Sequence, residues 1–120
     1  YAKKRGVKII ALTNLNYSKS VISRHPSGKR LFELADIILD NHGDIGDAAC
    51  DIPGAEQKVG PTSTVIGAAI LDEIVVDASR KIVRDLHQDA PVFYSANLDG
   101  GDEKNKKLAY EYKDMIHYEY

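Results

Sequence analysis

Apolar residues recur at every fourth position between residues 62 and 86, and this regular spacing constrains the fold more than any other feature of the sequence. The repeat consists of Ile66, Ile70, Ile74, Ala78 and Ile82. Charged residues fill the opposite face, where Asp77 and Lys81 stand four positions apart and form a favourable helical pair. An apolar stripe of this period predicts one long amphipathic helix over residues 62–86, with its apolar face packed on other elements.

Two short apolar runs come before this helix and predict strands. Residues 7–12 (VKIIAL) are rich in β-branched side chains, and residues 37–39 form the second run. Continuous apolar runs of this length are typical of buried parallel strands. A short helix is expected between them over residues 29–35. The alternation of strands and helices predicts an α/β fold with a parallel sheet.

The remaining segments are expected to be loops, apart from the end of the chain. Residues 14–28 are polar, and residues 41–61 contain four glycines and two prolines. Residues 91–96 could form a strand or an extended arm. A final helix is predicted from an N-cap at Asp102 to about His117.

The first residues resemble the end of a helix. Lys3, Lys4 and Arg5 suit the negative end of a helix, and Gly6 can adopt the left-handed cap conformation. A strand is expected directly afterwards. We therefore expect the sequence to enter in the middle of a fold and to belong to a longer protein.

The composition argues against several classes of function. Of 120 residues, 16 are Lys or Arg and 18 are Asp or Glu, so the net charge of −2 predicts no nucleic-acid partner. The apolar run at residues 65–71 is too short to span a bilayer, and no membrane partner is expected. The single Cys50 cannot form an internal disulfide, which fits a reducing, cytoplasmic location, and it is expected to be a small buried residue.

Three consecutive hydroxyl residues, Thr62, Ser63 and Thr64, stand at the predicted start of the long helix. Free backbone N–H groups and the helix dipole make such a terminus an anion site, so these residues could hold a phosphate or a sugar. The alternative is that their hydroxyls only cap the helix, with Pro61 in its first turn.

The loop after the first predicted strand is a second candidate ligand site. Its polar members are Asn14, Ser18, Lys19 and Ser20. In open α/β sheets, ligands bind beyond the carboxyl ends of the strands, and these side chains suit hydroxyl and phosphate groups. A solvated turn without a ligand explains the same composition.

A basic segment follows at residues 23–30. Arg24 and Lys29 could neutralise an anion, and His25 is the candidate general acid or base. A polar loop that leads into a helix is the alternative. The segment is not a P-loop, because Arg30 stands where that motif needs Ser or Thr.

An acidic segment at residues 40–51 resembles a calcium loop in its spacing. Ile45 stands where that loop needs Gly, and Asp51 stands where it needs Glu, so this type of calcium site is excluded. A turn-forming acidic loop is the preferred interpretation. The residues that could hold another divalent ion are His42, Asp44 and Asp47.

Two features near the end of the chain also have two interpretations. Residues 95–103 could be a mobile lid in which Asn97 or Asp99 contacts ligand hydroxyls, or a turn followed by a helix cap. A group of tyrosines is expected to pack or to form an interface. These tyrosines are Tyr110, Tyr112, Tyr118 and Tyr120.

Taken together, five segments resemble the C-terminal half of sugar isomerase (SIS) domain proteins. The segments are KIIALTNLNYSKS (8–20), SRHPSGKRLFELADIILDN (23–41), GDA (46–48), KVGPTSTVIGAAILDEIVVDA (58–78) and PVFYSANLDGGDEKN (91–105). They are similar to a bacterial branch of the family whose members are labelled phosphoheptose isomerases. The resemblance spans nearly the whole chain, and it depends on the order of the segments rather than on any one of them.

The resemblance implies a three-layer αβα sandwich with a parallel five-stranded sheet. Residues 1–120 would be the C-terminal portion of one such domain, with residues 1–90 in its core and residues 91–120 as an arm and a helix. It further implies a homodimer or homotetramer that binds a phosphosugar or another sugar derivative, without a cofactor or a metal.

The resemblance also implies an activity and a set of contacts. The activity is phosphosugar isomerisation, with His25 as the catalytic acid or base; the alternatives are a non-catalytic phosphosugar sensor and an amino-sugar phosphate lyase or etherase. The phosphate-binding loop of the family would lie before Tyr1. For the hydroxyl residues the resemblance favours ligand contact over simple capping. The expected ligand contacts are Asn14, Ser18, Lys19, Ser20, Arg24, Thr62, Ser63, Thr64 and Asn97.

Overall fold

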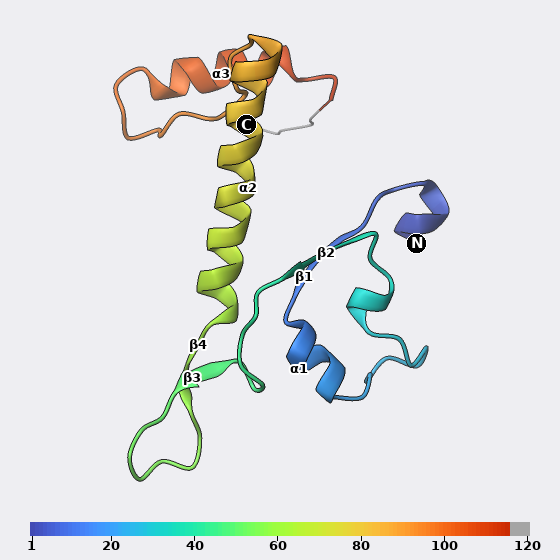
Figure 1. The fold of residues 1–120 in the computed structure, drawn as a ribbon. Coiled ribbons are helices and arrows are strands. Elements are labelled where there is room, and N and C mark those ends of the chain that lie inside the picture. The colour runs from blue at the N-terminus through green and yellow to red at the C-terminus, as the bar shows by residue number, and fades with distance from the viewer. Residues whose placement is uncertain (116–120) are drawn as a thin grey trace. The chain divides into compact units, whose positions relative to one another are not determined.

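The computed structural model of the chain describes residues 1–115. The chain divides into two compact units, Tyr1–Ile74 and a second unit that begins at Val75. Figure 1 shows the elements in chain order, from the first sheet to the last helix. Because short sheets and α-helices both occur, the chain is mixed α/β, and the predicted class is confirmed at that level.

Strands β1 (Ile10–Thr13) and β2 (Ile37–Asp40) pair in parallel, with their first residues opposite each other. This confirms the predicted parallel pairing. Strand β1 begins later than predicted because the ladder stops at Ile9, whose backbone N–H donates to the carboxylate of Asp36 at 2.8 Å. A side-chain acceptor there takes the place of a strand carbonyl.

The strands are more exposed than predicted. Ala11 is the one buried hydrophobic residue in the described part of the chain, whereas Ile10 and Ile37 are more than half exposed. The prediction of fully buried strands is therefore wrong for this chain. The cause lies in the sheet itself, which has two strands among the described residues and so leaves both outer edges open.

Helix α1 (Leu15–Ser20) lies in a segment that was predicted to be a loop, and that prediction is wrong. Asn14 caps the helix, because its side chain accepts a hydrogen bond from the backbone N–H of Tyr17 at 2.9 Å. Asn and Ser are typical of caps and turns, so the composition of this short helix resembles that of a loop. At its other end, the guanidinium of Arg30 donates to the carbonyl oxygens of Ser18, Lys19 and Val21.

A single 3₁₀ turn, η2 (Leu31–Glu33), stands where a helix over residues 29–35 was predicted. The Glu33 carboxylate accepts from the backbone N–H of Arg30 at 2.8 Å and from its side chain at 3.1 Å. These contacts close the turn on itself, and Leu34 ends it.

A hairpin occupies part of the segment predicted to be a long loop, which corrects that prediction. Strands β3 (Ala48–Cys50) and β4 (Val59–Pro61) are antiparallel. An ion pair of 3.6 Å between Lys58 and Asp51 lies just beyond the paired residues. Cys50 is exposed, so its predicted burial is wrong. Pro61 closes β4 instead of entering the first turn of the following helix.

The long helix α2 (Ser63–Leu86) is confirmed almost to the residue. The predicted pair of Asp77 and Lys81 forms at 2.7 Å. Gly67 is buried against β1, where a Cβ atom at this position would lie 2.9 Å from Cδ2 of Leu12. The start of α2 therefore packs closely on the first sheet.

The predicted helix end with a glycine cap at the start of the chain is also observed. Residues Ala2–Arg5 make the 3₁₀ helix η1, and Gly6 caps it in the left-handed conformation with φ of 73°. No helix in the described residues is both long and apolar enough to cross a membrane.

The second unit ends in α3 (Gly101–Glu111), which begins at a Gly100 cap and not at Asp102. The Asn105 side chain accepts from the backbone N–H of Tyr94 at 2.8 Å and donates to its carbonyl at 2.9 Å. Residues 91–96 form no strand, which leaves the extended arm of the two alternatives. The predicted positions at 116–118 and Tyr120 lie outside the described residues.

Candidate functional site

The amino end of α2 is held by a carboxylate from the preceding loop. Asp47 accepts from the backbone N–H and from the hydroxyl of Ser63, each at 2.8 Å. It also accepts from the backbone N–H of Thr62 at 3.2 Å. The Thr62 hydroxyl donates to the backbone carbonyl of Asp47 at 3.1 Å. Asp47 thus caps α2 from a distance in sequence.

These contacts determine the charge state of Asp47. The Ser63 hydroxyl lowers the pKa of the Asp47 carboxyl most strongly. Desolvation works to raise this pKa, but the remaining hydrogen bonds from Ser63 and Thr62 outweigh it, so the net shift is downward. The carboxylate is ionised near neutral pH, where it complements the positive end of the α2 dipole.

The local backbone brings Asp47 to this position. Gly46 and Asp47 both adopt positive φ, at 87° and 72°. The N–H of Asp47 donates to the carbonyl of Asp44 at 2.9 Å and closes a turn. The turn-forming interpretation of this acidic segment is thereby observed.

Two asparagines and one glycine complete the same corner. Asn41 is nearly buried, and its side chain accepts from the N–H of Gly43 at 3.2 Å. The Asn14 amide donates to the carbonyl of Asp44 at 3.2 Å. A Cβ atom at Gly43 would lie 3.0 Å from both Asn14 Nδ2 and Thr62 Oγ1, so a larger residue here would have to push these two side-chain ends aside.

A cavity of about 340 Å³ opens at this corner, beyond the carboxyl ends of β1 and β2. Its polar lining combines hydroxyls, amides and one carboxylate, and Leu12 and Tyr17 also line it. The polar lining residues are Thr13, Asn14, Ser18, Asn41, Asp47 and Ser63. Within this described lining there is no Lys, Arg or His, so the wall carries negative charge.

Asp40 supports the same corner from the end of β2. Its Oδ1 accepts from the N–H groups of Leu15 and His42 at 3.1 and 3.0 Å. Desolvation works to raise the pKa of Asp40, but these two hydrogen bonds and the nearby His42 give a net lowering. Asp40 therefore joins the start of α1 to the end of β2 as a charged acceptor.

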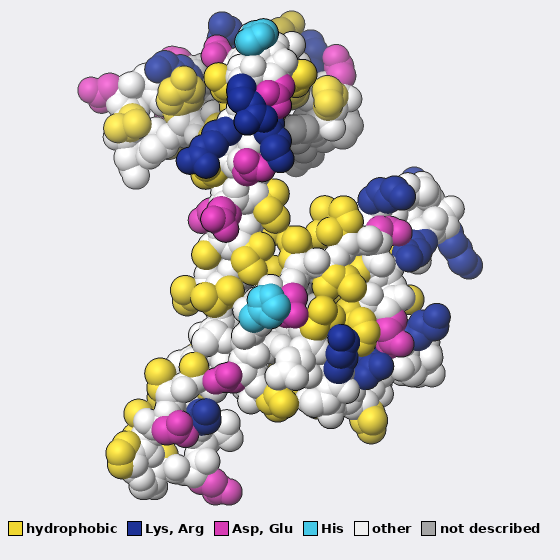
Figure 2. All heavy atoms as spheres, viewed as in Figure 1, with side chains coloured by type: hydrophobic (Ala, Val, Ile, Leu, Met, Phe, Trp, Pro, Cys, Tyr) yellow, Lys and Arg dark blue, Asp and Glu magenta, His cyan; other side chains and the backbone are white. Residues whose placement is uncertain are grey.

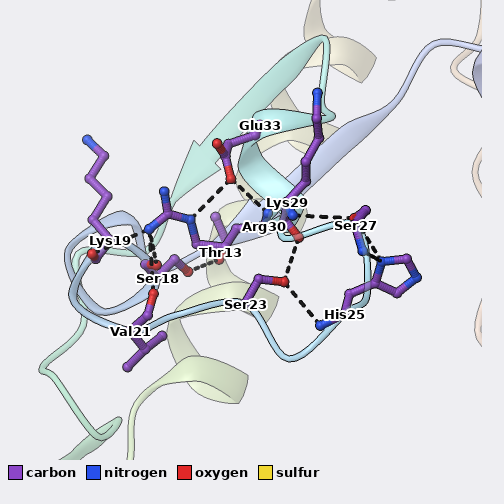
Figure 3. Close-up of polar contacts among 10 residues, drawn as sticks. All are labelled: Thr13, Ser18, Lys19, Val21, Ser23, His25, Ser27, Lys29, Arg30 and Glu33. Carbon is purple, nitrogen blue, oxygen red and sulfur yellow. Dashed lines mark hydrogen bonds and ion pairs between the residues drawn. The ribbon is translucent and has the colours of Figure 1, made fainter.

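The basic segment forms a loop with its own hydrogen bonds, shown in Figure 3. His25 Nδ1 lies 2.8 Å from the Ser27 hydroxyl and accepts from the Ser27 backbone N–H at 3.2 Å. The Ser23 hydroxyl donates to the carbonyl of Lys29 at 2.8 Å. Because the backbone N–H occupies Nδ1, the neutral ring carries its proton on Nε2.

The structure brings together some of the predicted site residues and not others. Asn14, Ser18 and Ser63 line the cavity, and Thr62 adjoins it through Asp47 and Gly43. The Ser20 hydroxyl instead donates to the carbonyl of Tyr17 at 2.8 Å. The predicted site residues outside the described lining are Lys19, Ser20, Arg24, His25, Thr64 and Asn97.

Asn41 and Asp47 also line the cavity but were not predicted as sugar or phosphate contacts, since Asp47 was named only for a divalent ion. Asn41 directly follows β2, so the rule that selected the loop after β1 would also have selected it. Asp47 gave no such signal, because its role depends on contacts across the loop with residues 62 and 63. Within residues 1–115, no three His, Cys, Asp or Glu side chains gather as a metal site, so the divalent alternative at His42, Asp44 and Asp47 is not formed.

Comparison with known proteins finds similarity to bacterial UPF0309 proteins, while no family model matches the chain. The chain is 50% identical over 117 residues to a UPF0309 protein of Shouchella clausii, a match of 98% of this chain and 47% of that protein. It is likewise 50% identical over 117 residues to one of Oceanobacillus iheyensis. A third, from Geobacillus kaustophilus, is 42% identical over 115 residues. The chain thus spans about half the length of the curated relatives it matches.

Proposed function

We propose that the chain contributes a binding site for a sugar derivative, and that the natural ligand is a phosphosugar. The cavity beyond β1 and β2 is the observation that supports this proposal most directly. Its hydroxyl and amide groups can donate to and accept from sugar hydroxyls, while Leu12 and Tyr17 offer an apolar surface to the C–H face of a sugar ring.

The negative charge of the cavity indicates which part of the phosphosugar would bind there. Asp47 is an ionised carboxylate, and it already occupies the N–H groups at the start of α2. A phosphate in the same place would meet like charge. The sugar hydroxyls therefore bind in the cavity, and the phosphate binds outside it. Lys19 and Arg24 remain the proposed cations for the phosphate.

The proposed activity is aldose–ketose isomerisation of that phosphosugar. The proposal includes the three-layer SIS-like sandwich and its assembly as a homodimer or homotetramer, both of which rest on the sequence resemblance. Isomerisation needs a group that moves a proton between adjacent carbons. His25 is the proposed acid or base, and Ser27 holds its ring in place through Nδ1.

A non-catalytic phosphosugar sensor is the second candidate. The observation in its favour is the cavity lining, because its described residues include one carboxylate and no histidine. Under this alternative, Asp47 and the neighbouring hydroxyls hold the ligand without moving a proton. An amino-sugar phosphate lyase or etherase remains a further alternative from the resemblance alone.

A ligand screen followed by one substitution tests these proposals. Thermal unfolding of the chain is recorded with sugar phosphates, amino-sugar phosphates, their unphosphorylated forms and inorganic phosphate. A rise in Tm with phosphosugars beyond that with phosphate supports the binding proposal. No rise with any sugar derivative contradicts it.

For the sugar that binds, isomer formation is then followed in the chain, in His25→Gln and in the control His87→Gln, which changes a histidine in the second unit. Turnover that is lost in His25→Gln alone, with binding kept, supports the isomerase. Binding without turnover in every form favours the sensor.

A further inference from the structure

Arg30 differs from the other basic residues of the first unit. Within residues 1–74, every Lys and every other Arg is exposed, and Figure 2 shows such side chains in dark blue standing out from the surface. The Arg30 side chain, in contrast, is 32% exposed. A partly buried cation needs partners that replace water, so the contacts of Arg30 indicate what it does.

The partners of Arg30 are the last carbonyl groups of α1. Its Nη1 lies 3.5 Å from the carbonyl oxygens of Ser18, Lys19 and Val21, as Figure 3 shows. This helix end has no glycine cap, because Val21 follows it in an extended conformation. The guanidinium therefore serves carbonyl groups that the helix leaves free, and its charge suits the negative end of the helix.

The guanidinium is itself held on the η2 turn. Its Nε donates to the Glu33 carboxylate at 3.1 Å, and the same carboxylate accepts from the backbone N–H of Arg30 at 2.8 Å. The Cζ atom of Arg30 also lies 5.0 Å from the centre of the Phe32 ring. Because the fork-shaped guanidinium has partners on the turn as well as on the helix, it joins the two elements.

Helix α1 depends on such contacts from outside. It has six residues, far fewer than an isolated helix needs to be stable in water. Its start is fixed by Asn14 and Asp40, each of which accepts from a backbone N–H of the first turn. Arg30 supplies the contact at the other end. The position of the second half of α1 therefore depends on Arg30.

The second half of α1 contributes to the cavity. Tyr17 and Ser18 both line it, whereas Arg30 is not part of the described lining. The Ser18 hydroxyl lies 3.0 Å from the Thr13 hydroxyl of β1, and the Ser18 carbonyl accepts from Arg30. Ser18 is thus the residue through which Arg30 acts on the cavity.

We propose that Arg30 is a positioning residue for the cavity. It fixes the end of α1 on the η2 turn, and it thereby sets the place of the Ser18 hydroxyl. Arg30 in this way controls the affinity for a sugar derivative without contacting it. This inference rests on the proposed function, because it takes the cavity as the place where the sugar binds.

Calorimetric titration with an aldose–ketose pair, glucose 6-phosphate and fructose 6-phosphate, tests the proposal in the full chain below its Tm. Arg30→Met keeps a long side chain but removes the guanidinium. It should weaken binding about fivefold, as expected when the hydrogen bond from Ser18 is lost. Arg5→Met is the matched control, because Arg5 also bonds and stacks on a ring, that of Tyr1, but in η1. It should change the affinity less than twofold.

Two further variants separate positioning from a general loss of stability. If Arg30 acts through Ser18, Arg30→Met combined with Ser18→Ala should bind about as weakly as Ser18→Ala alone. Losses that multiply to about twenty-five-fold would overturn the proposal. Arg30→Lys returns a positive charge and N–H donors to the end of α1, so it should recover part of the affinity. Equal losses in Arg30→Lys and Arg30→Met would also contradict the proposal.

Amide hydrogen exchange, followed by NMR without a sugar, gives a readout that is independent of the proposed function. Arg30→Met should speed exchange of the Ser18, Lys19 and Ser20 amides, and Arg5→Met should not. Unchanged exchange in Arg30→Met overturns the proposal. Faster exchange, together with binding of neither sugar by the unsubstituted chain, would support the hold of Arg30 on α1 and contradict the proposed function instead.

Discussion

Ser63 donates two hydrogen bonds to Asp47, one from its backbone N–H and one from its hydroxyl, each at 2.8 Å. One residue thus binds both oxygens of a carboxylate that comes from a turn sixteen positions earlier. This contact fixes the acidic loop on the first turn of α2. It also places a negative charge where a helix terminus would otherwise attract an anion.

Removal of this carboxylate should destabilise the first unit. Asp47→Ala leaves the N–H and the hydroxyl of Ser63 without their acceptor, whereas the N–H of Thr62 keeps the backbone carbonyl of residue 47. Loss of such a helix cap destabilises proteins. We expect the Tm to fall by roughly 4–8 °C, the shift that corresponds to the loss of one cap in a small domain. Asp51→Ala, which removes an exposed ion pair with Lys58 in the hairpin, is the control and should change the Tm little. Equal shifts in both variants would refute the capping role.

Acid should weaken the same contact. The pKa of Asp47 in the folded chain lies below its ordinary value of 3.8, so its stabilising contribution is complete above pH 3.8 and is lost as the pH falls through the lower, folded value. Urea unfolding at a series of pH values should show this loss below about pH 4. In Asp47→Asn the loss in that window should be smaller. An unchanged pH profile in the variant would assign the acid sensitivity to other carboxylates.

Ser18 and Ser20 offer a matched pair for ligand binding, because they lie on the same short helix. The Ser18 hydroxyl lines the cavity and bonds with the Thr13 hydroxyl at 3.0 Å, whereas Ser20 bonds to a helix carbonyl outside the lining. Ser18→Ala should weaken binding of the sugar derivative about fivefold, as expected for one hydrogen bond. Ser20→Ala should change it less than twofold. Calorimetric titration of both variants measures the two affinities. A larger loss in Ser20→Ala than in Ser18→Ala would show that the ligand does not bind in this cavity.

Gly43 should be intolerant of a side chain. A Cβ atom there would lie 3.0 Å from Asn14 Nδ2 and Thr62 Oγ1, so Gly43→Ala must displace part of the cavity wall. We expect lower stability and at least tenfold weaker ligand binding. Gly54→Ala introduces backbone strain at φ of 84° but meets no atom within 4 Å. Gly54→Ala should therefore lower stability but leave the affinity for the ligand unchanged. A similar loss of affinity in Gly43→Ala and Gly54→Ala would argue against a local effect at Gly43.

The elements that follow from local periodicity could be predicted from the sequence. The apolar repeat of α2 and the run that ends in β2 are encoded within a few neighbouring residues, and both elements are observed. Helix α1 was missed because Asn14 can open either a turn or a helix, and the contacts of Arg30 with the end of α1 come from a distant residue.

The candidate site shows the same division. Asn14, Ser18 and Ser63 were selected from the sequence because they follow a strand or begin a helix, which are positions that general rules of α/β sheets select. They line the cavity, and their contact with a ligand stays a prediction. Asp47 was missed because its partners lie fifteen and sixteen positions away in the sequence. Burial of the strands was also misjudged, since it depends on what covers the sheet and not on the apolar run itself.

The close approach of Gly67 and Leu12 links the packing of α2 to the size of the cavity, two properties that natural variation would otherwise change separately. Leu12 lies against α2 at Gly67, and it also lines the cavity. If position 67 acquires a side chain during evolution, Leu12 must shift or become smaller, and the size of the cavity changes with it. Divergent members of this lineage should therefore vary at these two positions together, and ligand preference should drift with helix packing.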